Sequence, residues 1–171
     1  MVTIRIAEAS LGRLRKHLLP DRSRREQGAF LFCRDSVLSE GHVVFDCQSW
    51  VALKPEDYDV QENDYLELAD ATRARLMKQA HDGQFSLVES HSHPGPYPAA
   101  FSFSDLSGLA EFVPHVRWRL HGRPYAALVF ARTGFDGLAW IDNSKVSQQV
   151  NAIETGRERI LSTGLTLNRR A

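Results

Sequence analysis

The chain has 171 residues, of which 43% are hydrophobic, and it carries 21 lysines and arginines against 21 aspartates and glutamates. That length is typical of one domain with a sizeable core, and the balanced charge argues against a general attraction to nucleic acid or membrane lipids. No apolar run approaches a membrane span, the first residues lack a signal-peptide layout, and two cysteines suit a reducing compartment, so we expect a cytoplasmic protein.

Hydrophobic periodicity predicts alternating strands and helices in the first half of the chain. The expected strands are 2–6, 30–33 and 42–47, the last extending towards residue 53, and the expected helices are 8–19 and 62–80. The long second helix is favoured because Tyr65, Thr72 and Leu76 share one helical face. Acidic residues begin this segment and Gly83 follows it, as is typical of a helix.

The second half of the chain continues the same alternation. The expected strands are 84–91, 125–131 and 138–141, with a turn at 133–134, and the expected helices are 104–113 and 146–162. This order predicts an α/β fold with a mainly hairpin-connected sheet and flanking helices. We expect a single domain, in which residues 1–145 form the main body and residues 146–171 form its C-terminal helix and tail.

The motif richest in chemical information is His91-Ser92-His93-Pro94, followed by Ser102-Phe103-Ser104-Asp105. Residues i and i+2 of a strand face the same side, so both histidines point the same way before Pro94 ends the strand. Ser104 is a good N-cap, which predicts Asp105 in the first turn of a helix. A catalytic zinc ion takes three such ligands and keeps water in the fourth position, so the motif indicates a metal hydrolase.

Together with Glu26 well upstream, this motif resembles that of the JAMM family of metalloproteases, also called JAB or MPN+. The family pattern is a glutamate, then His-x-His-Pro, then Ser-x-x-Asp. The run from Pro94 to Phe101 has eight residues, one more than is usual in the family. The resemblance covers roughly residues 1–142 and implies a cytidine deaminase-like fold, a curved mixed sheet flanked by helices, with residues 1–145 as the JAB/MPN domain.

The resemblance also implies a role for each residue of the motif. One zinc ion per chain would be held by His91, His93 and Asp105. Glu26 would take a proton from the attacking water and pass it to the leaving amine. Ser102 would donate a hydrogen bond to the oxyanion of the tetrahedral intermediate.

Several residues near the motif have both an ordinary and a functional interpretation. Glu89 shares a strand face with His91 but lies deeper, so we expect a structural or supporting role. Tyr97, Phe101 and Phe103 are expected to pack the loop, the alternative being a groove for a substrate tail. Cys33 and Cys47 are expected to be strand or core residues. A basic patch, either a solvated face or a docking surface for an acidic partner, consists of Arg13, Arg15, Lys16, Arg22, Arg24 and Arg25.

The function implied by the resemblance is that of a deubiquitinase-like isopeptidase or peptidase. It would hydrolyse the amide bond after the C-terminal glycine of a ubiquitin-like protein, in deconjugation or in precursor maturation. The compact chain is similar to prokaryotic members, which accompany ubiquitin-like conjugation operons, including antiphage systems. The implied partners are a ubiquitin-like protein or its conjugates and conjugation-system proteins, without nucleic acid or membrane.

Two alternatives stay open. One is a peptidase for sulfur-carrier protein adducts, which would release a small amino acid. The other is a non-catalytic module that only binds a ubiquitin-like partner. The presence of all five motif residues, Glu26, His91, His93, Ser102 and Asp105, argues for catalysis.

Overall fold

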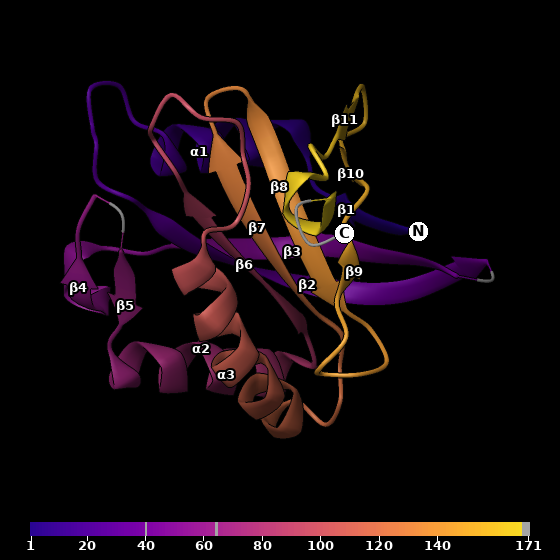
Figure 1. The fold of residues 1–171 in the computed structure, drawn as a ribbon. Coiled ribbons are helices and arrows are strands. Elements are labelled where there is room, and N and C mark those ends of the chain that lie inside the picture. Colours follow the sequence, from indigo (N-terminus) through magenta and orange to yellow (C-terminus); the bar gives the residue numbers. More distant parts are fainter. Residues whose placement is uncertain (40, 64, 169–171) are drawn as a thin grey trace.

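A curled nine-stranded sheet forms the centre of the protein in the computed structural model, which describes residues 1–39, 41–63 and 65–168 (Figure 1). The strand order is β11-β10-β1-β3-β2-β6-β7-β8-β9. Pairing is parallel between β1 and both β3 and β10 and between β6 and β7, and the other pairs are antiparallel. The strands of this sheet are β1 (Val2–Arg5), β2 (Gly28–Ser39), β3 (His42–Ala52), β6 (Ser86–Ser92), β7 (Tyr125–Ala131), β8 (Gly134–Trp140), β9 (Gln148–Gln149), β10 (Ala152–Glu154) and β11 (Arg159–Leu161).

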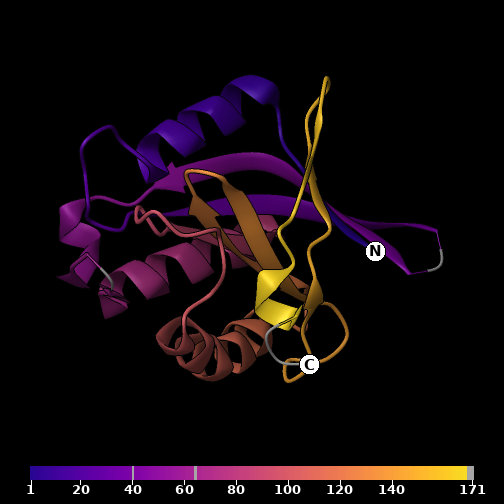
Figure 2. The ribbon, with the colours of Figure 1, turned by 45° about the horizontal axis from the view of Figure 1, so that its top comes forward.

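Helices cover both faces of the sheet, with α1 (Glu8–Leu18) on one side and α2 (Asp70–Gly83) and α3 (Phe103–Arg119) on the other (Figure 2). The central strand β2 shows the consequence in its side chains. Leu31 belongs to the core cluster under α1, whereas Phe30 and Phe32 belong to the cluster under α2 and α3. A strand buried on both faces needs apolar residues at successive positions, which explains the uninterrupted apolar run that begins β2.

The mixed α/β class and the flanking helices are confirmed, and the expected helix at 8–19 and strands at 84–91 and 125–131 lie close to α1, β6 and β7. Helix α3 is longer than the expected 104–113, because it continues through Pro114. Proline removes one hydrogen-bond donor from a helix interior. The burial of Val113, Val116 and the following Leu120 holds the helix together across this gap.

The expected helix at 62–80 is wrong in its first part. Strands β4 (Tyr58–Gln61) and β5 (Leu66–Leu68) form a separate two-stranded sheet there, after the short 3-10 helix η1 (Pro55–Asp57), and α2 begins only at Asp70. Leu66 and Leu68 alternate with Glu67 and pack against the core under α2 and α3. That two-residue period is the pattern of a strand, and it was too short to outweigh the longer helical pattern.

The expected helix at 146–162 is also wrong. This segment forms β9, β10 and β11, and the short helix α4 (Leu165–Asn168) follows it. Strand β10 pairs in parallel with β1, and Ile153 is buried beneath α1. Backbone pairing with β1, a strand about 150 positions earlier, decides this structure, and such pairing has no local sequence pattern.

No helix among residues 1–39, 41–63 and 65–168 is both long enough and apolar enough to cross a membrane.

Candidate metal centre

The two histidines lie at the end of β6, between β2 and β7. His91 is the partner of Gly28 in β2 and of Val129 in β7. His93 follows the strand, and its backbone N–H still donates to the carbonyl oxygen of Phe130 at 2.8 Å. Hydrogen bonding on both sides of β6 therefore fixes the backbone that carries both imidazoles, as the strand interpretation of the motif predicts.

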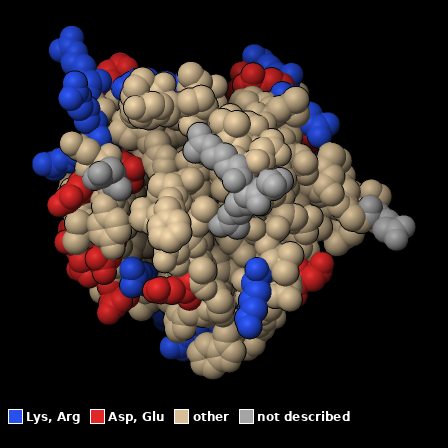
Figure 3. Space-filling view, viewed as in Figure 1, with Lys and Arg blue, Asp and Glu red and all other residues tan. Residues whose placement is uncertain are grey.

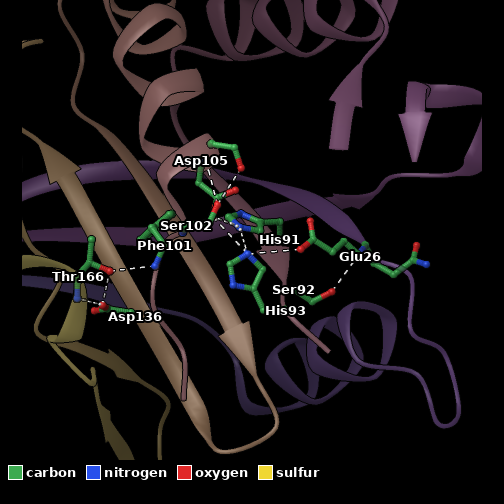
Figure 4. Close-up of polar contacts among 11 residues, drawn as sticks. Glu26, His91, Ser92, His93, Phe101, Ser102, Asp105, Asp136 and Thr166 are labelled. Atoms are coloured by element: carbon green, nitrogen blue, oxygen red, sulfur yellow. Dashed lines mark hydrogen bonds and ion pairs between the residues drawn. The ribbon is translucent and has the colours of Figure 1, made fainter. Parts of the chain in front are cut away.

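Ser92, between the two histidines, fastens the segment that carries Glu26 to the same strand. Its hydroxyl accepts a hydrogen bond from the backbone N–H of Gln27 at 3.0 Å, and its own N–H donates to the Gln27 carbonyl oxygen at 3.0 Å. Glu26 is next to Gln27 and is only 5% exposed. Residues more than sixty positions apart are thereby brought to one place (Figure 4).

Asp105 lies in the first turn of α3, as expected, but the N-cap of this helix is Ser102 rather than Ser104. The Ser102 hydroxyl accepts from the Asp105 N–H at 3.1 Å, and an Asp105 carboxylate oxygen accepts from the Ser102 N–H at 2.6 Å. These reciprocal hydrogen bonds form a capping box, with aspartate in the place of the usual glutamate. The cap holds the Asp105 carboxylate at the start of the helix, where it faces the histidines (Figure 4).

His91, His93 and Asp105 form a cluster that could hold a metal ion. The two Nε2 atoms are 3.3 Å apart, and Asp105 Oδ2 lies 3.5 Å from His91 Nε2 and 3.3 Å from His93 Nε2. Zinc–ligand bonds of about 2.0–2.1 Å at tetrahedral angles place neighbouring ligand atoms roughly 3.3–3.4 Å apart. The three side chains therefore form the triangular face that such an ion requires.

The charges of the cluster stabilise one another. Burial alone would lower the pKa of His91, but the carboxylates of Asp105, Glu26 and Glu89 raise it to about 9. Burial would raise the pKa of Asp105, but His91 and the hydrogen bonds from His93 and Ser102 hold it well below its usual range. The carboxylate is thus in its ligand form. A histidine ligand must be neutral, so a metal ion would displace the His91 proton.

Glu26 lies beside the cluster, with its Oε1 atom 3.4 Å from His93 Nε2. The structure therefore brings all five motif residues to one place, although they come from the loop before β2, the end of β6 and the start of α3. The longer run from Pro94 to Phe101 does not displace Ser102, because its hydroxyl still caps α3 next to Asp105.

A cavity of about 930 Å³ opens beside the cluster, and Glu26, His91 and Asp105 are among the residues that line it. Residues of β5 and α2 line one wall of the cavity, and residues of α3 line another. Glu89 faces the same cavity and accepts a hydrogen bond from the Tyr125 hydroxyl. Burial raises the pKa of Glu89, and this partnership agrees with the supporting role expected for it. Nothing in the sequence distinguishes Tyr125, because its position in an apolar strand resembles that of any core aromatic residue.

The three aromatic residues of the loop separate into two kinds. Phe101 is buried, and its ring packs edge-on against the His91 ring at a centroid distance of 5.7 Å. It packs the loop, as expected. Tyr97 and Phe103 are instead 77% and 89% exposed, and Phe103 lies on the cavity wall.

Two other sequence features are placed by the structure without an assigned function. All six residues of the basic patch are exposed, and Arg22, Arg24 and Arg25 lie in the loop before Glu26. Figure 3 shows basic side chains at the upper left and acidic ones below them, over the β4–β5 region. Cys33 and Cys47 are opposite one another on β2 and β3 and are free thiols.

Comparison with known protein families finds no family model that matches the chain, and comparison with curated protein sequences finds no significant match either. The interpretation of the site therefore rests on its own geometry.

Proposed function

We propose that the protein is a zinc-dependent isopeptidase or peptidase of the JAMM/JAB (MPN+) type, with a cytidine deaminase-like fold. Its reaction is hydrolysis of the amide bond after the C-terminal glycine of a ubiquitin-like protein. The observation that carries this proposal is the triangle formed by His91, His93 and Asp105, with the buried Glu26 carboxylate beside it. Two imidazoles and one carboxylate are a donor set found in hydrolytic zinc sites, which keep a further position open for water.

The proposed chemistry divides among the residues by position. A zinc ion held by the three ligands would polarise the scissile carbonyl group and lower the pKa of water. The Glu26 carboxylate accepts the proton of the attacking water and passes it to the leaving amine. The Ser102 hydroxyl accepts a hydrogen bond from the Asp105 N–H and lies 3.0 Å from the Ser104 hydroxyl. With Ser104 as the donor of that pair, the Ser102 hydrogen is available to the oxyanion.

The cavity supports an extended substrate tail. Strand β5 is bonded only to β4 within the described sheets, so it has a second edge along which an extended chain could pair. Leu66 and Leu68 of this strand and Phe103 of α3 offer apolar contacts on the two walls. A glycine next to the scissile bond suits an approach confined between these walls, because it has no side chain to accommodate.

The buried general base favours catalysis over a module that only binds. A docking surface has no use for a carboxylate that is 5% exposed and lies 3.4 Å from a metal-ligand atom. A sulfur-carrier peptidase would use the same groups, so it differs from the leading proposal in its leaving group. The proposed setting is the bacterial cytoplasm, within a ubiquitin-like conjugation system such as those of antiphage defence.

The test combines metal analysis with cleavage of fusion proteins. A ubiquitin-like protein ending in Gly-Gly is joined to either a reporter protein or a single small amino acid, and release is followed by mass spectrometry. We expect one zinc per chain and cleavage that chelation abolishes. Glu26→Gln should keep the zinc but lower the rate by about 10²- to 10⁴-fold. The control is Glu56→Gln, which changes an exposed carboxylate outside the cavity and should leave the rate unchanged.

The two fusions separate the two peptidase proposals. Preferred release of the reporter protein supports the isopeptidase, and preferred release of the amino acid supports the sulfur-carrier peptidase. Cleavage that persists after chelation or in Glu26→Gln contradicts the mechanism. Zinc binding with no cleavage of either fusion favours the binding module.

A further inference from the structure

The C-terminal segment holds the loop that leads from His93 to Ser102. The Thr163 hydroxyl donates to the carbonyl oxygen of Ala99 at 2.7 Å. The backbone N–H of Phe101 donates to the hydroxyl oxygen of Thr166 at 3.0 Å. Phe101 and Thr166 are both buried, so the hydrogen bond between them is shielded from water. Figure 4 shows Thr166 on the side of Phe101 opposite the histidines.

Asp136 of β8 fixes this segment in turn. It is completely buried, and its Oδ1 atom accepts from Gln149 Nε2 at 2.8 Å and from the Ser162 hydroxyl at 2.7 Å. Its Oδ2 atom accepts from the Thr166 N–H at 2.8 Å and from the Thr166 hydroxyl at 2.6 Å. A hydroxyl has one hydrogen, and Thr166 gives it to Asp136. The Thr166 oxygen keeps its lone pairs for the Phe101 N–H, which can only donate, so both hydrogen bonds form together.

Phe101 connects this network to two of the three ligands. Its ring packs against the ring of His91 at a centroid distance of 5.7 Å. Its peptide directly precedes Ser102, whose N–H donates to the Asp105 carboxylate at 2.6 Å. A shift of the Phe101 backbone would therefore move both the packing surface of His91 and the cap that aims Asp105.

We infer that Asp136, Thr163 and Thr166 are positioning residues for the metal centre. They hold the backbone from Ala99 to Phe101, which in turn supports His91 and Asp105. The inference rests on the part of the proposed function that gives the cluster a metal ion, and it does not depend on the substrate. Groups outside the ligand set that orient the ligands commonly contribute about 10- to 100-fold to metal affinity. The last described part of the chain is thus a component of the site.

The direct test measures metal affinity in Thr166→Val and Thr166→Ser, with Zn²⁺ in competition with a chromophoric chelator. Valine keeps the shape of threonine but removes the hydroxyl, so we expect about 10-fold weaker zinc binding. Serine keeps the hydroxyl and should bind as tightly as the unsubstituted chain. Replacing zinc by Co²⁺ adds an absorption spectrum that reports ligand geometry, and this spectrum should change in the valine variant and return in the serine variant.

A matched control separates positioning from general loss of stability. Ile153→Val removes one methylene from the core under α1, away from the loop, and should lower the melting temperature by about 2–4 °C. We expect its zinc affinity and Co²⁺ spectrum to be unchanged. Should Thr166→Val fail to fold, Thr163→Val replaces it, because that change releases Ala99 and leaves Asp136 paired with Thr166. It should weaken zinc binding by less than the roughly 10-fold expected of Thr166→Val, because Ala99 lies farther from the ligands along the chain than Phe101 does.

The possible failures are distinguishable. Unchanged zinc affinity in Thr166→Val, or in Thr163→Val where it takes its place, overturns the inference and leaves the proposed function intact. The inference is also overturned if Thr166→Val and Ile153→Val both weaken zinc binding in proportion to their losses of stability, because the effect is then one of general stability. If the unsubstituted chain binds no metal, the metal centre and the inference both fail.

Discussion

Ser102 has two roles in the proposed mechanism, and a pair of substitutions separates them. Its hydroxyl caps α3 by accepting from the Asp105 N–H, and it is also the proposed donor to the oxyanion. Ser102→Ala removes both roles. Ser102→Gly removes the hydroxyl as well, but glycine is itself a tolerated N-cap residue.

The expected magnitudes differ enough to be resolved. Loss of the cap costs about 1 kcal/mol of folding stability in the alanine variant and a few tenths of a kcal/mol in the glycine variant. A domain stable by about 5–15 kcal/mol stays folded after either change. Loss of an oxyanion donor lowers kcat by about 10²- to 10³-fold. Unfolding cannot produce a loss of that size, so both variants should lose the same activity and differ only in stability.

The assay combines urea unfolding, zinc analysis and single-turnover cleavage of the fusion protein. Zinc analysis is needed because Ser102 also holds the proposed ligand Asp105, whose carboxylate accepts from the Ser102 N–H. Both variants retain this N–H, so we expect both to keep their zinc. Equal zinc content with an equal loss of rate supports the donor role. If the glycine variant cleaves at nearly the rate of the unsubstituted chain, Ser102 is only a cap and the oxyanion is stabilised elsewhere.

Two further predictions concern stability. In Gly137→Ala the new Cβ would lie 2.7 Å from Leu128 Cδ2 and 2.8 Å from Val150 Cβ, so we expect urea unfolding to show a free energy of unfolding lower by about 1–3 kcal/mol. In Gly12→Ala, within α1, the new Cβ meets no atom within 4 Å, so the free energy of unfolding should rise by about 0.5–1 kcal/mol. Equal effects of the two changes would contradict the packing argument. Burial would raise the pKa of Asp136, but hydrogen bonds from Thr166, Ser162 and Gln149 lower this pKa overall. The Asp136 carboxylate should therefore stabilise the fold above about pH 4, and this stabilisation should disappear as the pH falls through the lowered pKa of the folded state. Asp136→Asn should lower the free energy of unfolding by about 2–3 kcal/mol at pH 7 and remove much of the loss of stability at acid pH. The measurement is the thermal unfolding temperature as a function of pH, and a pH dependence identical to that of the unsubstituted chain would refute this role of Asp136.

The local part of the site could be predicted because its signals are short-range. The alternation that places His91 and His93 on one face spans three residues, and the Ser-x-x-Asp pattern is a capping box within one helical turn. The prediction of Ser104 as the N-cap is wrong, because the three-residue spacing of a capping box places the cap at Ser102. The position of Glu26 came from the family resemblance, since a glutamate after three arginines in a loop is otherwise an ordinary surface residue.

The missed elements all depend on distant partners. Strand β10 has three residues and gains its structure from β1, and β5 gains its structure from β4 and from the core beneath it. Thr166 gave no signal either, because its partners Asp136 and Phe101 are 30 and 65 positions away. Threonine and aspartate are frequent surface residues, so only the fold reveals that these two are buried against each other.

The charges of the cluster favour a metal ion over a protein partner as its purpose. Carboxylates removed from water are costly unless a cation compensates them. Glu26 is buried and Asp105 is half-buried, and both have oxygen atoms within 3.5 Å of His93 Nε2. Without a metal ion, compensation comes from the proton that keeps His91 charged up to a pKa of about 9. A dication that displaces this proton adds one further positive charge at the same place, and the ligand atoms already have the required spacing. A metal ion at the cluster would therefore account for both carboxylates, as the proposed function requires.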